Sequence, residues 1–130
     1  MTRFALSLAL LMTAAGIACM PAGMSDAQPS PRPPGDLRCG WYDNPTPGNH
    51  WLTDRDGEWT LGEQGGYQVP GLDDLGNMAR GGKVYTNGSY GYSCACMRVD
   101  VDWQTRRVTR VYSARSIPLS RCRNDRALSR

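Results

Sequence analysis

Apolar and polar side chains alternate most regularly in the C-terminal half of the chain. The alternation sets four apolar residues against three charged ones: Met97, Val99, Val101 and Trp103 against Arg98, Asp100 and Asp102. A period of two is typical of a β-strand that buries one face. We therefore expect a strand here, with a partner strand over residues 107–114 after a turn at residues 104–106.

A second hairpin is expected earlier in the chain. Residues 50–53 and 58–61 flank Asp54-Arg55-Asp56-Gly57, a turn sequence in which Gly57 takes a positive φ. The same Asp-x-Asp-Gly run, with Glu63, partly fits a calcium-binding loop, but Leu52 stands at the first ligand position and offers no side-chain oxygen. We interpret the run as a turn and predict no metal site.

The remaining segments favour strands and irregular loops over helices. Residues 84–86 precede an Asn87-Gly88 turn and predict a short strand. Residues 62–82 are rich in Gly, and their apolar positions follow no helical period, so we expect a long loop. The chain is thus predicted to be all-β or mostly β, a small single domain with one antiparallel sheet and long irregular loops.

Four segments are expected along the chain. Residues 1–27 read as a signal peptide, with Arg3, an apolar run and a small-x-small cleavage site at Ala27. Residues 28–36 hold four prolines and predict an extended linker. Residues 37–126 form the folded domain, and residues 127–130 are a C-terminal tail.

Export to the periplasm or the medium follows from the N-terminal segment. The apolar run is shorter than the roughly 20 residues that a transmembrane helix needs, and no later stretch comes close, so no transmembrane helix is expected. As an alternative, Gly16-Ile17-Ala18-Cys19 resembles a lipoprotein cleavage box, in which Cys19 is the anchored residue. Either cleavage leaves the same four cysteines in the domain.

The four cysteines Cys39, Cys94, Cys96 and Cys122 predict a disulfide framework, because an even count in a small exported domain is typical of one. A zinc site would require a second close pair of ligands, and the domain has a single histidine, His50. We expect no cofactor. The core has no Phe and one Ile after residue 27, so cross-links are expected to supply much of the stability.

Strand geometry limits the pairing of these cysteines. Cys94 and Cys96 are two apart on one strand face, and bridging them to each other would strain the backbone. With the hairpin centred near residues 104 and 105, Cys96 lies opposite Ser113, and the chain returns past Cys94. This favours Cys94–Cys122 and Cys39–Cys96 over the other pairing that the strand geometry leaves open.

Several motifs together resemble a small exported bacterial family catalogued only as a domain of unknown function, number 4087. They are residues 38–41 (RCGW), 44–49 (NPTPGN), 51–59 (WLTDRDGEW), 64–67 (QGGY), 87–92 (NGSYGY), 94–96 (CAC) and 118–122 (PLSRC). The resemblance covers almost the whole domain. It implies a single secreted or periplasmic domain with these four cysteines, and it supplies no activity and no catalytic residues.

No catalytic constellation can be assembled from the residues. His50 is the only histidine, and neither Ser89 nor Ser93 stands in a nucleophile elbow. Carboxylate pairs such as Asp54 with Glu58 are explained as solvated turn residues. We expect a protein that is not an enzyme.

Aromatic side chains among Gly and Asn form the candidate binding surface, because flat aromatic faces suit sugar stacking or a protein interface. These residues are Trp41, Trp51, Trp59, Tyr67, Tyr90 and Tyr92. Trp51 and Trp59 straddle the hairpin turn and are expected to lie close together. Some of the tryptophans will be consumed by a core that is short of Phe and Ile.

Charge is unevenly divided and adds one clue about partners. Residues 28–97 hold 5 basic and 8 acidic side chains, whereas residues 98–130 hold 9 and 3. A cationic end could contact anionic envelope polymers, although a solvated surface also explains it. No nucleic-acid motif is present, and we expect no nucleic-acid partner. The leading hypothesis is a non-catalytic binding, accessory or inhibitor-like module of the bacterial envelope; the alternatives are a glycan- or peptidoglycan-binding module and a small hydrolase.

Overall fold

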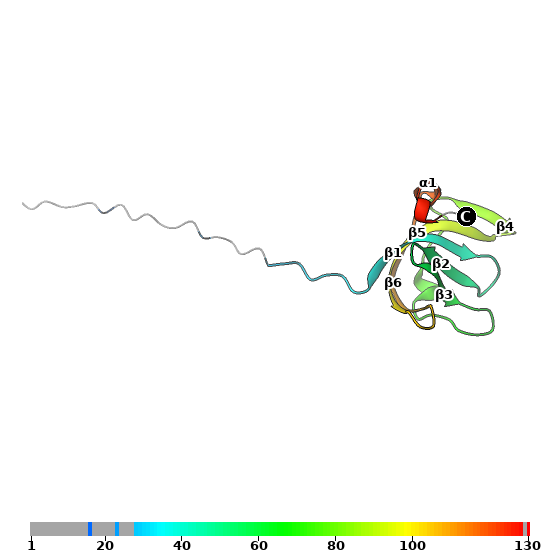
Figure 1. Ribbon diagram of the computed structural model, residues 1–130, viewed down its shortest axis with the longest axis horizontal. Coiled ribbons are helices and arrows are strands. Elements are labelled where there is room, and N and C mark those ends of the chain that lie inside the picture. The colour runs from blue at the N-terminus through cyan, green and yellow to red at the C-terminus, as the bar shows by residue number, and fades with distance from the viewer. Residues whose placement is uncertain (1–15, 17–22, 24–27, 129) are drawn as a thin grey trace, which may run out of the picture. The chain divides into compact units, whose positions relative to one another are not determined.

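Six strands of one sheet account for most of the folded chain (Figure 1). The computed structural model describes residues 16, 23, 28–128 and 130, so the predicted signal peptide and Cys19 lie outside the described residues apart from Gly16 and Gly23. The strands are β1 (Asp36–Asn44), β2 (His50–Asp54), β3 (Gly57–Gly62), β4 (Lys83–Asn87), β5 (Tyr90–Asp102) and β6 (Arg107–Ile117). The helical segments are η1 (Leu72–Asp74), α1 (Leu119–Arg123) and η2 (Arg126–Leu128).

Five of the strands close into a barrel. The sheet order is β1-β2-β3-β6-β5, and β5 pairs again with β1, while β4 extends the sheet beside β5. All pairings are antiparallel except that of β3 with β6, which is parallel. Three consecutive strands followed by one that returns beside the first make a Greek key. A partly open five-stranded Greek-key barrel is the architecture of the OB-fold, a likeness of topology that assigns no function.

The parallel seam of the barrel is short and is completed by the long loop between β3 and β4. The β3–β6 ladder holds one residue pair, Thr60 with Arg107. Beyond it, the loop inserts between the two strands: Val69 N donates to Leu61 O (2.8 Å), and Val111 N donates to Pro70 O (3.2 Å). The predicted irregular loop is therefore a structural part of the barrel wall.

Alternate residues of each strand fill the barrel. Leu52, Trp59, Leu61, Met97 and Val99 are fully buried in this core. Burial of such side chains contributes about 1.5–3 kcal/mol each. The predicted burial of alternate residues in β5 is thus confirmed for Met97 and Val99.

A second, smaller core lies on the outer side of β1 and β5, under the C-terminal segment. Trp41, Cys94, Cys122 and Leu128 form it. The indole Nε1 of Trp41 donates to Leu128 O at 2.7 Å, which ties η2 to β1. The domain therefore ends in a packed cap, and part of the predicted tail at residues 127–130 belongs to it.

The two predicted disulfides are confirmed as Cys39–Cys96 and Cys94–Cys122. Cys39 lies directly opposite Cys96 in the β1–β5 ladder. The disulfides fit an oxidising compartment outside the cytoplasm. In the described part of the chain, no helix is long and apolar enough to cross a membrane.

The predicted register of the β5–β6 hairpin is wrong by two residues at its far end. Near the turn, Asp102 pairs with Arg107 as expected, but irregularities follow at Asp100/Val101 and at Arg98/Val99. Each advances β6 by one residue, so Cys96 lies opposite Arg115 and not Ser113. Such bulges increase the local twist that a small closed barrel requires.

Candidate ligand-binding site at one end of the barrel

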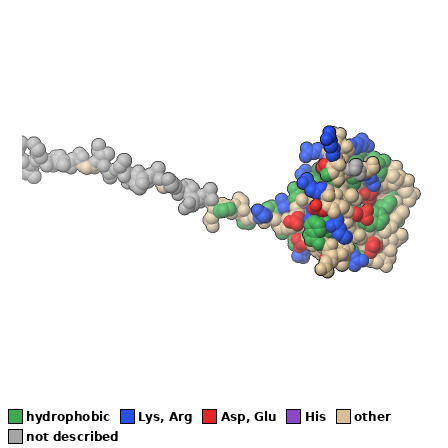
Figure 2. All heavy atoms as spheres, in the orientation of Figure 1, with side chains coloured by type: hydrophobic (Ala, Val, Ile, Leu, Met, Phe, Trp, Pro, Cys, Tyr) green, Lys and Arg blue, Asp and Glu red, His purple; other side chains and the backbone are tan. Residues whose placement is uncertain are grey.

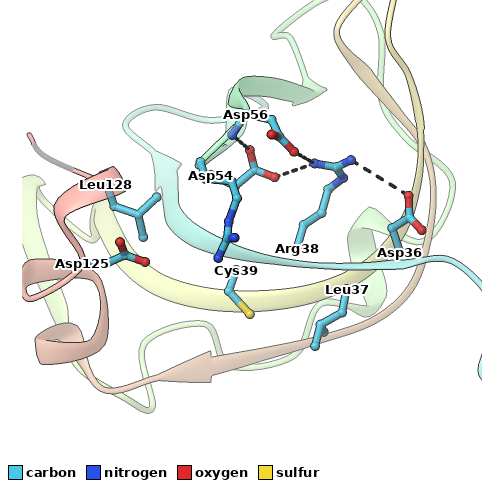
Figure 3. Close-up of a pocket in the computed structure, with 9 residues that line it drawn as sticks. Asp36, Leu37, Arg38, Cys39, Asp54, Asp56, Asp125 and Leu128 are labelled. Carbon is cyan, nitrogen blue, oxygen red and sulfur yellow. Dashed lines mark hydrogen bonds and ion pairs between the residues drawn. The ribbon is translucent and has the colours of Figure 1, made fainter.

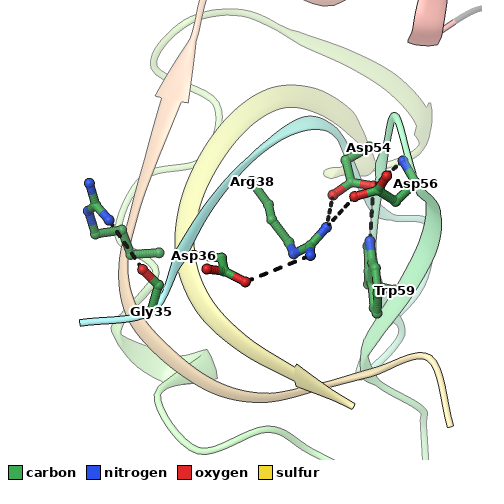
Figure 4. Close-up of polar contacts among 7 residues, drawn as sticks. Gly35, Asp36, Arg38, Asp54, Asp56 and Trp59 are labelled. Atoms are coloured by element: carbon green, nitrogen blue, oxygen red, sulfur yellow. Dashed lines mark hydrogen bonds and ion pairs between the residues drawn. The ribbon is translucent and has the colours of Figure 1, made fainter. Parts of the chain in front are cut away.

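A charged side chain occupies the barrel interior at the end where β1 begins. Arg38 belongs to the inward-facing set of β1 with Gly40 and Tyr42, and only 8% of it is exposed. Its Nη1 atom lies 2.7 Å from Asp54 Oδ2 and 3.0 Å from Asp56 Oδ2 (Figure 4). A buried guanidinium requires such partners, because an unpaired buried charge is strongly unfavourable.

Asp54 organises the β2–β3 turn around this ion pair. Its other oxygen, Oδ1, accepts hydrogen bonds from Asp56 N (2.8 Å) and from the indole Nε1 of Trp59 (3.0 Å). Gly57 has φ 113°, which confirms the predicted hairpin turn. One carboxylate therefore fixes the turn, the Trp59 ring and the Arg38 guanidinium relative to one another.

Trp59 lies between two guanidinium groups. The Cζ atoms of Arg38 and Arg106 lie 4.4 Å and 3.8 Å from the ring centroid. Trp103 packs against Trp59 edge to face, with 4.9 Å between ring centroids. This end of the barrel is therefore built from stacked cationic and aromatic groups, each contact contributing about 0.5–2 kcal/mol.

Trp103 caps the stack and remains 57% exposed. It begins the β5–β6 turn, in which the Asp102 carboxylate accepts hydrogen bonds from the backbone N–H groups of Gln104 and Thr105. These hydrogen bonds, foremost those from the backbone, lower the pKa of Asp102 below its ordinary value. The turn is thus braced, and the indole is held at a fixed position.

Arg106 completes this arrangement at a conformational cost. Its φ of 57° lies in the left-handed region, where non-glycine residues are uncommon. The conformation brings its guanidinium over Trp59 and allows a hydrogen bond to Asp56 O, so the β5–β6 turn is joined to the β2–β3 turn. Strain of about 1–3 kcal/mol persists where surrounding contacts determine the backbone.

A pocket of about 570 Å³ opens beside the buried ion pair (Figure 3). Its charged lining residues are Asp36, Arg38, Asp54, Arg55, Asp56 and Asp125. The volume lies in the range of small-ligand sites. Since both carboxylates and guanidinium groups line it, the pocket offers acceptors and donors of hydrogen bonds.

Both carboxylates of the β2–β3 turn in this pocket, those of Asp54 and Asp56, are paired with Arg38. Asp54 is buried and accepts three hydrogen bonds, from Arg38, Asp56 N and the Trp59 indole. Desolvation alone would lower the pKa of Arg38, but the hydrogen bonds and charges of Asp54 and Asp56 outweigh it and raise that pKa. Arg38 therefore stays cationic and keeps both carboxylates engaged.

Comparison with known proteins places the chain in a family. Residues 35–129 match the sequence profile of the family described as "Protein of unknown function (DUF4087)". The match begins one residue before β1 and covers the barrel and its cap. The chain belongs to the DUF4087 family. No curated protein and no solved structure matches it.

The six aromatic residues of the predicted binding surface lie in different parts of the DUF4087 domain. Trp41 (4% exposed) and Trp59 (0%) are buried and have no face to offer a ligand. Tyr92 packs edge to face on Trp41, with ring centroids 5.5 Å apart. The hydroxyl of Tyr67 donates to Val108 O at 2.7 Å, and Arg107 lies over its ring, so Tyr67 closes the barrel seam.

Trp51 and Trp59 occupy neighbouring positions of the β2–β3 ladder but point to opposite faces of it. Trp59 lies opposite Leu52 in the β2–β3 ladder, and both side chains point into the barrel. Trp51 precedes Leu52 on β2, so its side chain points outward. Trp51 and Tyr90 are half-buried on different strands, β2 and β5. The six aromatic residues thus form no single surface.

His50 is paired with a tyrosine. Its Nδ1 lies 2.6 Å from the Tyr42 hydroxyl, and the two rings stack with centroids 6.0 Å apart. Burial raises the pKa of Tyr42 and lowers that of His50, although the charge of Asp73 opposes the shift at His50. Neither Ser89 nor Ser93 is a hydrogen-bond partner of His50 within the described residues.

Two residues of the site escape sequence reasoning. The alternation from Met97 predicts that Trp103 is buried, but Arg38 and Trp59 already fill that end of the barrel and leave Trp103 at its rim. Arg38 itself looks like an ordinary polar residue next to Cys39. A usable signal is its place on the inward-facing positions of β1, two residues before Gly40.

Proposed function

We propose that the DUF4087 domain is a non-catalytic binding module of the bacterial envelope, and that it binds a neutral glycan at the Trp103 end of the barrel. The observation that carries the proposal is the exposed Trp103 indole, fixed on Trp59 beside a pocket lined by carboxylates and guanidinium groups. The apolar face of a sugar ring stacks on such an indole, and its hydroxyls both donate and accept hydrogen bonds.

Local charge favours a neutral ligand over a strongly charged one. The pocket carries four carboxylates and two guanidinium groups, and Arg106 adds a third cation beside it. Because the charges nearly cancel, the site offers fixed dipoles and hydrogen-bonding groups without a strong net field.

The topology gives independent but weaker support. The β5–β6 turn connects the fourth and fifth strands of the barrel, and in OB-folds the corresponding loop takes part in binding oligosaccharides and oligonucleotides. An envelope location is supported by the two disulfides and by the N-terminal sequence pattern.

Co-sedimentation with insoluble peptidoglycan and with a neutral glucan tests the proposal. We expect binding to at least one of them, and a loss of about tenfold or more, or about 1.4 kcal/mol, in Trp103→Ala. Tyr85→Ala is the matched control, because Tyr85 is 63% exposed but lies on β4 away from the pocket. Undiminished binding by Trp103→Ala would exclude this end of the barrel, and absence of binding to every glycan would leave the proposal without support.

A further inference from the structure

Arginine side chains gather on the outer face of the barrel, on the side of β5, β6 and α1. We call this surface the arginine face and define it by Arg98, Arg110 and Arg115 of the β5–β6 hairpin and by Arg121 and Arg123 of α1. Figure 2 shows Lys and Arg side chains clustered over α1. Among residues 103–128 and 130, a single acidic residue, Asp125, accompanies these cations.

The register of the sheet explains why the arginines share one side. Cys94 and Cys96 point outward toward α1, so their partners opposite, Ile117 and Arg115, point the same way. Arg121 lines a small pocket with Cys96 and Ile117, so it lies on the side of the sheet to which Cys96 and its partner Arg115 point. Arg98 lies two residues beyond Cys96 and therefore on the same face.

The arginine face is largely free of neutralising partners. The ion pairs formed within the described residues involve Arg38, Arg107 and Arg130, and none of the five arginines of this face. Two carboxylates lie next to it: Asp100, opposite Arg110 in the ladder, accepts a hydrogen bond from the Tyr112 hydroxyl at 2.6 Å, and Asp125 lines a pocket with Arg121. Five guanidinium groups against two carboxylates leave this face with a net positive charge.

Two exposed non-polar side chains border the same face. Leu37 lies opposite Arg98 in the β1–β5 ladder and is 54% exposed, and Tyr112, on β6, is 38% exposed. Exposed Leu and Tyr beside basic residues are typical of surfaces that contact the interface of a lipid bilayer. The combination favours a membrane over a soluble polyanion, which would use the charges alone.

We propose that the arginine face docks on an anionic phospholipid surface. The guanidinium groups of Arg115, Arg121 and Arg123 contact lipid phosphates, for which their planar donors are well suited. Leu37 and Tyr112 enter the headgroup region. This inference does not depend on the glycan site: Leu37 also lines that pocket, but none of the arginines that bind lipid phosphates and neither Tyr112 nor Trp103 is shared between the two surfaces.

Vesicle sedimentation tests the docking surface. The protein, with both disulfides intact, is mixed with vesicles of phosphatidylglycerol and phosphatidylethanolamine, or of phosphatidylcholine alone. We expect binding to the anionic vesicles only, weakened by raised salt. Since each basic residue near such a surface contributes roughly a fivefold gain, Arg115→Gln/Arg121→Gln should lose about 30-fold in partition coefficient.

The matched control removes two cations elsewhere. Arg55 lies on the β2–β3 turn and Lys83 on β4, so Arg55→Gln/Lys83→Gln carries the same net charge with the arginine face intact. All variants share one N-terminus and are compared by thermal unfolding. Equal losses in both pairs would overturn the proposal, because net charge alone would then explain binding.

Leu37→Ser separates a membrane from a polymer. It keeps every charge, and we expect it to weaken vesicle binding severalfold, most visibly at high salt, while leaving binding to soluble polyphosphate unchanged. Binding to polyphosphate without binding to vesicles would show that the partner is a soluble polyanion, and would overturn the proposal.

Discussion

Arg38 and Asp54 form an ion pair inside the barrel, with Arg38 Nη1 2.7 Å from Asp54 Oδ2 and both side chains less than a tenth exposed. The pair joins the first strand to the β2–β3 turn, on which the Trp59 ring and, through it, Trp103 are supported. Its contribution is therefore both to stability and to the shape of the proposed binding end.

Removing one partner of this pair should be costly. We expect Arg38→Met to lower the free energy of unfolding by about 3–5 kcal/mol, because it leaves the Asp54 carboxylate buried without a cation. Arg38→Met/Asp54→Leu should cost clearly less than the sum of the two single changes. Urea unfolding of the four proteins measures the coupling. Arg55→Met, an exposed change in the same turn, should fall within about 0.5 kcal/mol of the parent protein, and strictly additive losses would show that the pair is uncoupled.

The disulfides should contribute comparably to stability but differ in what they protect. They close loops with sequence separations of 57 and 28 residues, for which loop-closure entropy predicts about 4 kcal/mol each. In Cys94→Ser/Cys122→Ser, α1 also loses its attachment, so Trp41 should become solvated. We expect a red shift of tryptophan emission at low denaturant in this variant and not in Cys39→Ser/Cys96→Ser.

Thiol labelling provides the corresponding check on the wild-type domain. Denatured, unreduced protein should show no labelled peptide containing Cys39, Cys94, Cys96 or Cys122. Stoichiometric labelling of any of them would contradict the framework. An unchanged emission spectrum in the Cys94→Ser/Cys122→Ser variant would instead show that η2 holds its place on Trp41 without the bridge.

His50 should make stability depend on pH in one window. Burial lowers its pKa in the folded state below the ordinary value of 6.5, so the unfolded chain binds the proton more readily. The stability associated with neutral His50 is fully present above pH 6.5 and is lost as the pH falls through 6.5 toward the lower folded pKa. The free energy of unfolding should therefore fall more steeply between about pH 7 and 5 in the parent protein than in His50→Gln. Both proteins share all carboxylates, and parallel curves would rule out this role for His50.

The sequence predicted the elements that local pattern controls. The alternation from Met97, the Asp54–Gly57 turn and the placement of Cys94 and Cys96 on one strand face were sufficient for the hairpins and for both disulfides. These features depend on neighbours along the chain or across one turn. The resemblance to the DUF4087 family was likewise confirmed, by a match to the family profile over residues 35–129.

The barrel and the candidate site depend on contacts that no local pattern encodes. The two bulges of β5–β6, the single parallel pair Thr60–Arg107 and the burial of Arg38 all follow from closure of the sheet. Closure decides which aromatic residue is left outside. Trp59, a candidate for the binding surface, is buried, while Trp103, on the apolar side of the predicted alternation, is exposed, because one end of the barrel has room for Arg38 and a single indole.

Both disulfides have one cysteine on β5. Cys96 is joined to Cys39, earlier in the chain, and Cys94 is joined to Cys122, later in the chain. Cleavage of any single peptide bond between residues 39 and 122 consequently leaves two fragments that are still covalently joined. A protease that cuts the loop between β3 and β4 leaves them connected through Cys39–Cys96, and one that cuts the β5–β6 turn leaves them connected through Cys94–Cys122. A single cut in an exposed loop therefore breaks the backbone but does not separate the two fragments.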